Sequence, residues 1–241
     1  MKVLVLGGNG ATGIHVVGQL LENNVDVKTI VRNSAKLKSL GNKENLEIIT
    51  ASFLDMENAD LSKILDDVEA IVSCLGHNIT LKGMFGRPHR LVTDAIRKVC
   101  ESIRMKETGK VTKLVLMNTT ACLDVDAQEQ FTTAEGIILA IMRFLLPPQR
   151  DNEQAVNYLK HAIGKHDRNI EWIAVRPDTL IDEKEVTSYS VHNSPVRSPV
   201  FNSGKTSRIN VGSFIMNLLC NKEQWEKWKY QMPVIYNETS Q

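Results

Sequence analysis

The residues with the clearest chemical meaning lie near the start of the chain, where glycines recur at short spacing. Gly7, Gly10 and Gly13 recur at every third position, and they follow the apolar residues 3–6. Glycine allows a chain to leave a buried strand and enter a helix within a few residues, and it lets the main chain approach a pyrophosphate. The first amide groups of the helix then favour an anion. The spacing predicts a site for the diphosphate of a dinucleotide.

Basic residues follow the second apolar run, residues 27–31, and they indicate which dinucleotide is bound. An acid at this point would bind the 2′-hydroxyl of NAD, whereas this chain has Arg32, then Ser34 and Lys36. A guanidinium pairs with a 2′-phosphate, and each charge-assisted hydrogen bond contributes about 1.5–3 kcal/mol. We therefore predict that the cofactor is NADP(H). The alternative is a solvated basic turn without a ligand.

Short apolar runs and helical patterns alternate along the rest of the chain. We expect strands at residues 3–6, 27–31, 46–49, 70–76, 113–117 and 171–175, an edge strand at 234–236, and helices that include 59–65 and 90–104. Apolar strands separated by helices are typical of a parallel sheet covered on both faces. The predicted fold is therefore α/β: a Rossmann-like, doubly wound parallel sheet in a single domain, 1–241, in which residues 177–210 form a small substrate-binding part.

Ligands of such sheets bind beyond the carboxyl ends of the strands, which assigns a place to the residues that follow each strand. Ser52, Phe53 and Leu54 are expected at the adenine, although core packing is an equal alternative for Phe53 and Leu54. The expected cofactor contacts are Gly7, Asn9, Gly10, Ala11, Thr12, Gly13, Arg32, Ser34, Lys36, Ser52, Phe53, Leu54, Cys74, Leu75, Gly76, Asn118 and Pro177. Thr119 and Thr120 are the catalytic candidates, and the alternative is that their hydroxyls are structural.

Two segments interrupt the alternation of strands and helices, residues 78–90 and 188–206. Long loops in a compact domain usually have a function, so we expect both to help form the substrate pocket, with plain surface loops as the alternative. His77, His89 and His192 lie in or beside them and are candidates for proton relay, although a solvated histidine is the commoner case. None has a second ligand at metal spacing, so we expect no metal.

Composition narrows the class of protein. The chain has 241 residues, a formal charge of +1 and 42% hydrophobic residues, so we expect no affinity for nucleic acid or membranes. Its four cysteines, Cys74, Cys100, Cys122 and Cys220, have no metal or redox spacing. Because a core strand begins directly after Met1, we expect no signal peptide, a cytoplasmic location and a monomer.

The sequence also resembles a known family. Residues 7–13, 31–37, 145–151, 171–180 and 207–211 are similar to motifs of atypical short-chain dehydrogenase/reductases, in the NmrA-like NAD(P)H-binding group that includes biliverdin-IXβ reductase, a flavin reductase. In flavin-reductase-like relatives two basic residues hold the NADP 2′-phosphate, and Arg32 and Lys36 match them. The chain departs from these relatives at Ala51 and Ser52, where Gly-Asp is usual, and at Asp178, where glycine is usual.

The largest departure concerns catalysis. Common members of the superfamily use a Tyr-x-x-x-Lys pair as proton donor and activator, and this sequence contains none. Phe131 and Glu135 stand near the expected distance, and Tyr158 is only two residues from Lys160, so we interpret Tyr158 as a packing or surface residue. Loss of a general acid costs about 10²–10⁴ in rate. A conjugated acceptor has its own sink for the hydride, so the missing pair favours such an acceptor over an alcohol or ketone.

Three functions remain open from the sequence. The first is an NADPH-dependent oxidoreductase that transfers hydride to a flavin-, quinone- or tetrapyrrole-like small-molecule acceptor. The second is a non-catalytic NADP(H)-binding redox sensor of NmrA type, which would have a protein partner. The third and weakest is an epimerase or dehydratase of nucleotide sugars, since such enzymes resemble the Tyr-Lys pattern that is absent here.

Overall fold

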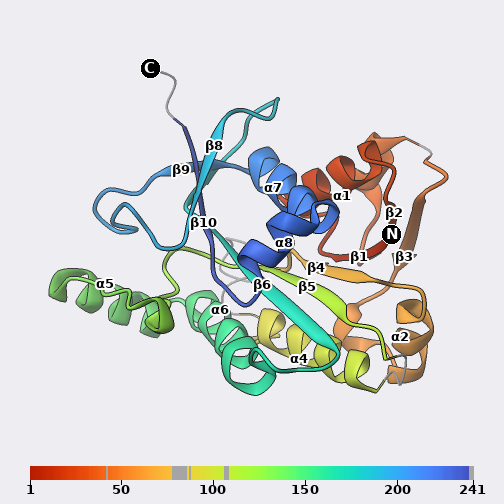
Figure 1. The fold of residues 1–241 in the computed structure, drawn as a ribbon, viewed down its shortest axis with the longest axis horizontal. Coiled ribbons are helices and arrows are strands. Elements are labelled where there is room, and N and C mark those ends of the chain that lie inside the picture. Colours follow the sequence, from red (N-terminus) through yellow and green to blue (C-terminus); the bar gives the residue numbers. More distant parts are fainter. Residues whose placement is uncertain (42, 78–85, 87, 106–108, 239–241) are drawn as a thin grey trace.

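The structure is a computed structural model, and it describes residues 1–41, 43–77, 86, 88–105 and 109–238. Within these residues a large central sheet is covered by helices on both faces (Figure 1). Its strand order is β3-β2-β1-β4-β5-β6-β10-β8. The strands are β1 (Lys2–Leu6), β2 (Asp26–Val31), β3 (Leu46–Thr50), β4 (Ala70–Ser73), β5 (Thr112–Met117), β6 (Ile170–Pro177), β8 (Tyr189–His192) and β10 (Val234–Asn237). The order confirms the predicted doubly wound, Rossmann-like α/β fold.

Strand pairing is parallel from β3 to β10, and β8 alone runs antiparallel to its neighbour β10. The prediction that residues 234–236 form an edge strand is wrong, because β10 pairs with β6 on one side and with β8 on the other. The fourth strand ends at Ser73, earlier than the predicted residue 76. This leaves residues 74–76 as a turn at the carboxyl end of the sheet.

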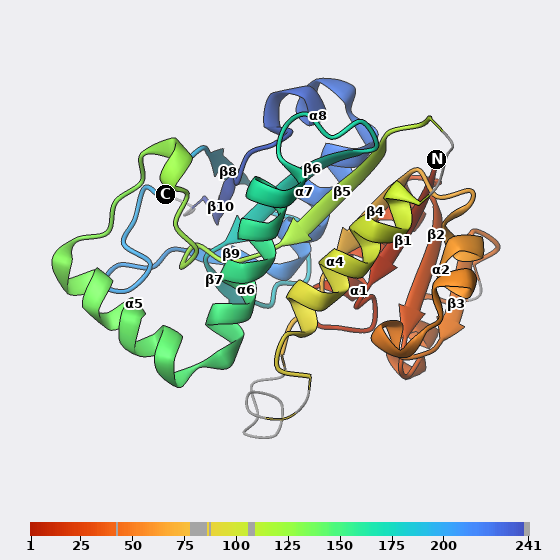
Figure 2. The same cartoon turned by 90° about the horizontal axis from the view of Figure 1, so that it is seen from below.

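The central strands are apolar on both faces because both faces are covered. In β1, Val3 and Val5 belong to one apolar cluster while Leu4 and Leu6 belong to the other, and all four are fully buried. One face is covered by α1 (Gly13–Glu22), α7 (Arg208–Cys220) and α8 (Lys222–Trp228), and the other by α2 (Asn58–Leu65), α4 (Leu91–Arg104) and α6 (Pro147–Tyr158). Figure 2 shows α4 and α6 side by side against the sheet.

Helix α5 (Thr133–Leu145) differs from the others because it projects away from the sheet before the chain turns into α6 (Figures 1 and 2). The predicted helices 59–65 and 90–104 correspond to α2 and α4. The described residues also form the short helical elements η1 (Ala35–Leu40), η2 (Phe53–Asp55), η3 (Val125–Ala127) and η4 (Leu159–Ile163). In the described part of the chain, every helix falls short of the length and apolarity needed to cross a bilayer.

The segment 188–206 is not simply a loop, as we had expected from its sequence. It contains β8 and the start of β9 (Lys205–Ser207), which pairs in parallel with β7 (Thr179–Ile181) in a small second sheet. The polar residues and prolines of this segment are not typical of strands, so the sequence does not indicate them. Their pairing partners, β10 and β7, lie far away along the chain, so local pattern gives little sign of them.

Candidate functional site

The glycine turn has the geometry that its spacing predicts. Gly7 adopts φ +78°, a conformation that other residues rarely take, and a Cβ on it would lie 2.8 Å from the carbonyl oxygen of Cys74. A Cβ on Gly13 would lie 2.1 Å from the carbonyl oxygen of Gly7. The turn is closed by a hydrogen bond from the amide of Gly10 to the carbonyl of Gly7, at 2.8 Å. Helix α1 can therefore begin close against the end of β1.

Within the described residues, no side chain caps the N-terminus of α1, although the amides of Ile14 and His15 donate to the carbonyls of Gly10 and Thr12. Thr12 is the buried N-cap residue, yet its side chain makes no capping hydrogen bond, and the first turn of the helix contains no acidic residue. The first amide groups of a helix lack partners within the helix and carry its positive dipole end. This arrangement suits a phosphate group.

A cavity of about 690 Å³ opens beside this turn, at the carboxyl ends of β1, β2 and β4. It brings together most of the residues that the sequence predicted for the cofactor. Those lining it are Gly7, Asn9, Gly10, Ala11, Arg32, Lys36, Ser52, Phe53, Leu54, Cys74, Leu75 and Gly76. Its volume lies in the range of about 300–1,000 Å³ that is usual for ligand and cofactor sites.

The basic edge of the cavity is held to the glycine turn by hydrogen bonds. The side-chain oxygen of Asn9 accepts from the amide of Lys36 at 3.1 Å, and Asn33 accepts from the amide of Ala35 at 2.8 Å. Arg32 and Lys36 are both exposed at this edge. Asn9 therefore fixes the turn that carries Lys36 relative to the turn that would face a diphosphate.

Further residues line the cavity without having been predicted for the site. Asn33 and Asp55 follow strand ends, and their position alone could have indicated them. The others are Ile30, Val31, Ala51, Pro88 and Leu91. Of the predicted pocket segment 78–90, residues 78–85 and 87 lie outside the described residues, while Pro88 lines this cavity.

Other predicted residues lie near the cavity or at the next strand ends, without lining it. Gly13 and Thr12 form the start of α1, and Ser34 precedes η1. Asn118 and Pro177 stand at the carboxyl ends of the neighbouring strands β5 and β6. The Asn118 amide nitrogen donates to the carbonyl of Asn152 at 3.0 Å, so its side chain ties the end of β5 to α6.

The two catalytic candidates have partners within the protein. The hydroxyl of Thr119 accepts from the amide of Ala121 at 3.3 Å, and the hydroxyl of Thr120 donates to the carboxylate of Asp178. Burial raises the pKa of Asp178, although this bond and amides from Gly204 and Thr179 act in the opposite direction. Both hydroxyls thus have hydrogen-bond partners within the protein, as expected if their role is structural. Their contact with a substrate stays a prediction.

Tyr158 and Lys160 contact different residues, as expected from their spacing in the sequence. Tyr158 packs beneath the guanidinium of Arg97, 5.3 Å from ring centroid to carbon, and burial raises its pKa. Lys160 forms ion pairs with Asp124 at 2.6 Å and Asp126 at 3.0 Å. Each of the two side chains therefore has its own partners within the protein.

His77 lies after the end of β4 and contacts α6. Its Nε2 is 2.8 Å from a carboxylate oxygen of Asp151, and both side chains are almost fully buried. The same carboxylate accepts from the amides of Val92 and Thr93 at 2.8 and 2.9 Å. Asp151 thus joins the turn after β4 to the start of α4. His89 is exposed, and His192 is 2.9 Å from the hydroxyl of Ser190.

Segment 188–206 lines two further cavities. One, of about 490 Å³, lies between residues 123–131 and 194–199, with Phe131 and Glu135 in its wall. The other, of about 470 Å³, is lined by residues that include His192, Arg197 and Tyr236. Among the described residues, no group of three or more His, Cys, Asp or Glu side chains is arranged to hold a metal ion.

Known structures share this fold. A Streptococcus pneumoniae protein to which NADH-flavin reductase activity is ascribed matches with TM-score 0.67 and 16% identity, covering 99% of this chain and 100% of that one. A Veillonella parvula short-chain dehydrogenase/reductase in complex with NADP matches with TM-score 0.69 and 12% identity, covering 98% and 94%. An Escherichia coli O157:H7 anaerobillin reductase matches with TM-score 0.65 and 14% identity, covering 100% and 99%.

At these low identities the structural similarity establishes only the fold. The assignment to a family rests on a comparison of the sequence. No curated protein matches the chain significantly. The model of a family described as NAD(P)H-binding matches residues 7–222, which include the glycine turn and every residue that lines the cavity. The resemblance to NAD(P)H-binding proteins is thereby confirmed, and the chain belongs to this NAD(P)H-binding family.

Proposed function

We propose that this chain is an NADPH-dependent oxidoreductase that transfers a hydride to a conjugated acceptor of flavin, quinone or tetrapyrrole type. The observation that carries the proposal is the placement of Arg32 and Lys36 at the edge of the cavity that the glycine turn forms. A cation at this edge pairs with a 2′-phosphate, which NADPH has and NADH lacks. The cavity therefore favours the phosphorylated cofactor.

The residues present fit such a cofactor. The N-terminus of α1 would hold the diphosphate, since the side chain of its N-cap residue Thr12 does not cap it. Phe53 and Leu54 offer apolar surface to the adenine, and the flat guanidinium of Arg32 suits both adenine stacking and phosphate pairing. The turn of Leu75 and Gly76 would border the ribose and the diphosphate.

The choice of acceptor follows from the contacts of Tyr158 and Lys160. When bound, NADPH supplies a hydride, and the acceptor then also needs a proton. Tyr158 and Lys160 are engaged with Arg97 and with two aspartates, so they do not supply it. An acceptor that delocalises the added charge can take its proton from water, and the protein then needs only to position it against the nicotinamide. An NADH-flavin reductase activity is ascribed to the S. pneumoniae protein, and an anaerobillin reductase activity to the E. coli protein.

The cofactor preference is tested with single variants of the basic edge. Arg32→Ala and Lys36→Ala should each weaken NADPH binding by roughly 10–100-fold, because one charge-assisted hydrogen bond contributes about 1.5–3 kcal/mol. NADH binding should change little. Lys38→Ala is the matched control, since Lys38 is exposed on η1 and does not line the cavity. Isothermal calorimetry with both nucleotides measures the effect, and equal losses for NADH and NADPH would remove the 2′-phosphate argument.

Turnover is tested by NADPH oxidation in a stopped-flow screen against flavins, quinones and tetrapyrroles. The proposal expects oxidation with at least one class and slow reaction with simple ketones. The second candidate is an NADP(H)-binding redox sensor, favoured by the engagement of Tyr158 and Lys160 in structural contacts. It predicts nucleotide binding without oxidation across the whole panel, and a partner protein that distinguishes NADP⁺ from NADPH.

A further inference from the structure

Helix α5 exposes apolar side chains to an extent unusual for a folded protein. Phe144 is 88% exposed, and Ile137, Ile141 and Leu145 each leave more than half of their surface uncovered. We call these four residues the outer face of α5. They lie on the helix that projects from the molecule in Figures 1 and 2. Single exposed apolar residues are ordinary, whereas a contiguous group marks an interaction surface.

The spacing of the outer face is that of a helix packing against another helix. Ile137, Ile141 and Phe144 are separated by four and three residues, the repeat that places side chains on one stripe of a helix. The opposite side of α5 is apolar as well, with Leu139 buried and Met142 half-buried against the protein. A helix that is apolar on both sides is normally covered on both.

The charges on α5 indicate what covers it. The outer face contains no charged residue. The only basic residue of the helix, Arg143, makes two hydrogen bonds to Glu153 at 2.6 and 2.8 Å, and its acidic residue, Glu135, is hydrogen-bonded to Thr132 and Ser198. A helix that lies on a membrane usually presents free lysine and arginine to anionic lipid. With its single cation already paired, α5 fits an uncharged protein surface better than a lipid headgroup layer.

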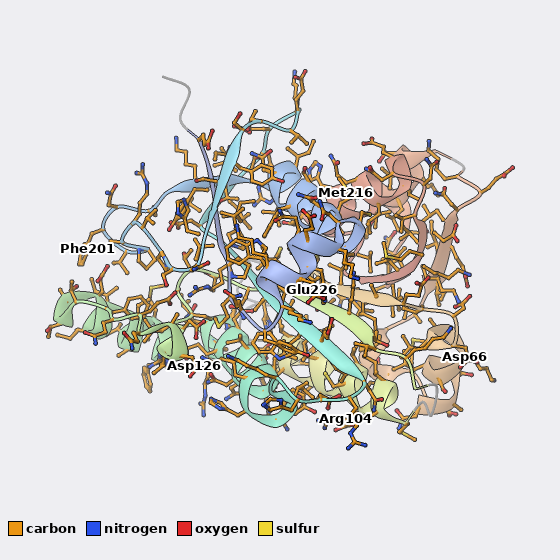
Figure 3. All side chains as sticks on the ribbon, viewed as in Figure 1. Asp66, Arg104, Asp126, Phe201, Met216 and Glu226 are labelled. Carbon is orange, nitrogen blue, oxygen red and sulfur yellow. The ribbon has the colours of Figure 1, made fainter. Side chains whose placement is uncertain are left out.

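A second copy of the chain supplies such a surface. Pairing across a two-fold axis places the outer face of one α5 on that of the other, so that no like charges meet. Phe201, 62% exposed, adds an apolar side chain near α5, because the Ser198 hydroxyl accepts from its amide at 2.9 Å and donates to Glu135 of α5. Figure 3 shows Phe201 on the side of the molecule where α5 projects.

The area of this surface is sufficient for a stable pair. The four side chains of the outer face and Phe201 leave on the order of 500 Å² of apolar surface in contact with water, since one aromatic side chain alone can bury about 150–250 Å². A standard interface uses about 800 Å² from each partner, of which about 65% is apolar in homodimers. The exposed apolar area therefore matches the core of one such interface.

We propose that this protein forms a homodimer in which the outer faces of two α5 helices pack against each other. The proposal replaces the expectation of a monomer that the sequence suggested. It does not depend on nucleotide binding, because α5 contributes no residue to the cofactor cavity. The two proposals can therefore fail separately.

The oligomeric state is tested by light scattering after size-exclusion chromatography. The full chain should have twice the monomer mass of 27.0 kDa, and Phe144→Glu should reduce it to 27.0 kDa. Met105→Glu is the matched control, because Met105 is 72% exposed at the end of α4, away from α5, and receives the same charge. Ile141→Gln, a milder change, should shift the mass in the direction of the monomer at dilute concentration. Circular dichroism and NADP⁺ binding show that each variant is folded.

Two results would overturn the proposal. One is a wild-type mass of 27.0 kDa at protein concentrations on the order of 100 μM, which would place any dissociation constant above that range. The other is a dimer whose mass Phe144→Glu and Ile141→Gln leave unchanged. Binding of a monomeric wild type to phosphatidylcholine vesicles, lost in Phe144→Glu, would instead identify a membrane as what covers the outer face.

Discussion

At the scale of single residues, the glycine turn shows why its sequence pattern is informative. Gly7 and Gly13 are required by contacts with nearby backbone, Cys74 and Gly7 respectively, so no larger residue fits without moving the chain. Such requirements are local, and a short motif records them. The position of Asn9 is different, because its hydrogen bond to Lys36 joins two turns that only the folded sheet brings together.

Gly13 and Gly18 allow a paired test within one helix. Gly13→Ala should lower the free energy of unfolding by about 1–3 kcal/mol and weaken NADP⁺ binding, because its Cβ would overlap the carbonyl of Gly7 and push α1 from the sheet. Gly18→Ala meets only Leu40, at 3.7 Å, and should raise stability by about 0.5–1 kcal/mol. Urea unfolding and calorimetry measure both. Equal stability of the two variants would contradict the close packing of α1 on β1.

At the scale of elements, α4 depends on a residue of another helix. No side chain of its own caps α4, and the carboxylate of Asp151, from α6, accepts from the amides of Val92 and Thr93 instead. The hydroxyl of Thr93 returns a hydrogen bond to the carbonyl of Asp151 at 3.0 Å. Burial alone would raise the pKa of Asp151, but hydrogen bonds from His77, Thr93 and Val92 hold it below its ordinary value.

Removing this carboxylate should cost stability. Asp151→Ala leaves two buried amides without an acceptor, at about 1–3 kcal/mol each, so we expect a loss of roughly 2–5 kcal/mol in the free energy of unfolding. Asn157→Ala, exposed on the same helix, is the control and should change stability by less than about 0.5 kcal/mol. Urea unfolding at neutral pH compares them, and a loss within the range of the control would show that α4 does not need this cap.

The same carboxylate predicts a pH dependence. Because its folded pKa lies below the unfolded value of about 3.9, its contribution is complete above that pH and is lost as the pH falls through the folded pKa. The stability difference between wild type and Asp151→Asn should therefore shrink as the pH falls below about 4. Unfolding curves at a series of pH values measure it. A difference that persists unchanged at low pH would contradict the assignment.

The elements also show where sequence reasoning reaches its limit. Strands β1, β2, β4, β5 and β6 could be predicted because an interior strand of a parallel sheet is apolar on both faces, a pattern confined to a few neighbouring residues. Strand β8 and the place of β10 could not, because each depends on pairing with a distant segment. Arg176 is a similar case: it is fully buried and paired with Glu129 at 2.6 Å, a contact across 47 residues that no local motif indicates.

At the scale of the whole molecule, the sheet separates two apolar clusters. Cys74 lies in the cluster beneath α1 and α7, whereas Cys100 and Cys122 lie in the cluster beneath α4 and α6. The expectation of a single domain requires that both clusters unfold together. The cysteines can test this, because burial raises the pKa of Cys74 to about 12 and raises the pKa values of Cys100 and Cys122 as well, which keeps all three as unreactive thiols.

Alkylation with iodoacetamide should therefore modify Cys220 alone in the native protein, since it is the exposed cysteine among the four. Burial also raises the pKa of Cys220, so its reaction should be slow but complete. With increasing urea, the three buried cysteines should become reactive at one common midpoint, because opening either cluster exposes the shared strands to water. Mass spectrometry of the alkylated peptides measures each site separately.

NADP⁺ should move the urea midpoints of all three buried cysteines upward together, because a ligand that binds only the native state stabilises the whole cooperative unit. Separate midpoints for Cys74 and for the Cys100 and Cys122 pair would show that the two faces of the sheet unfold independently, and the single-domain description would then be wrong.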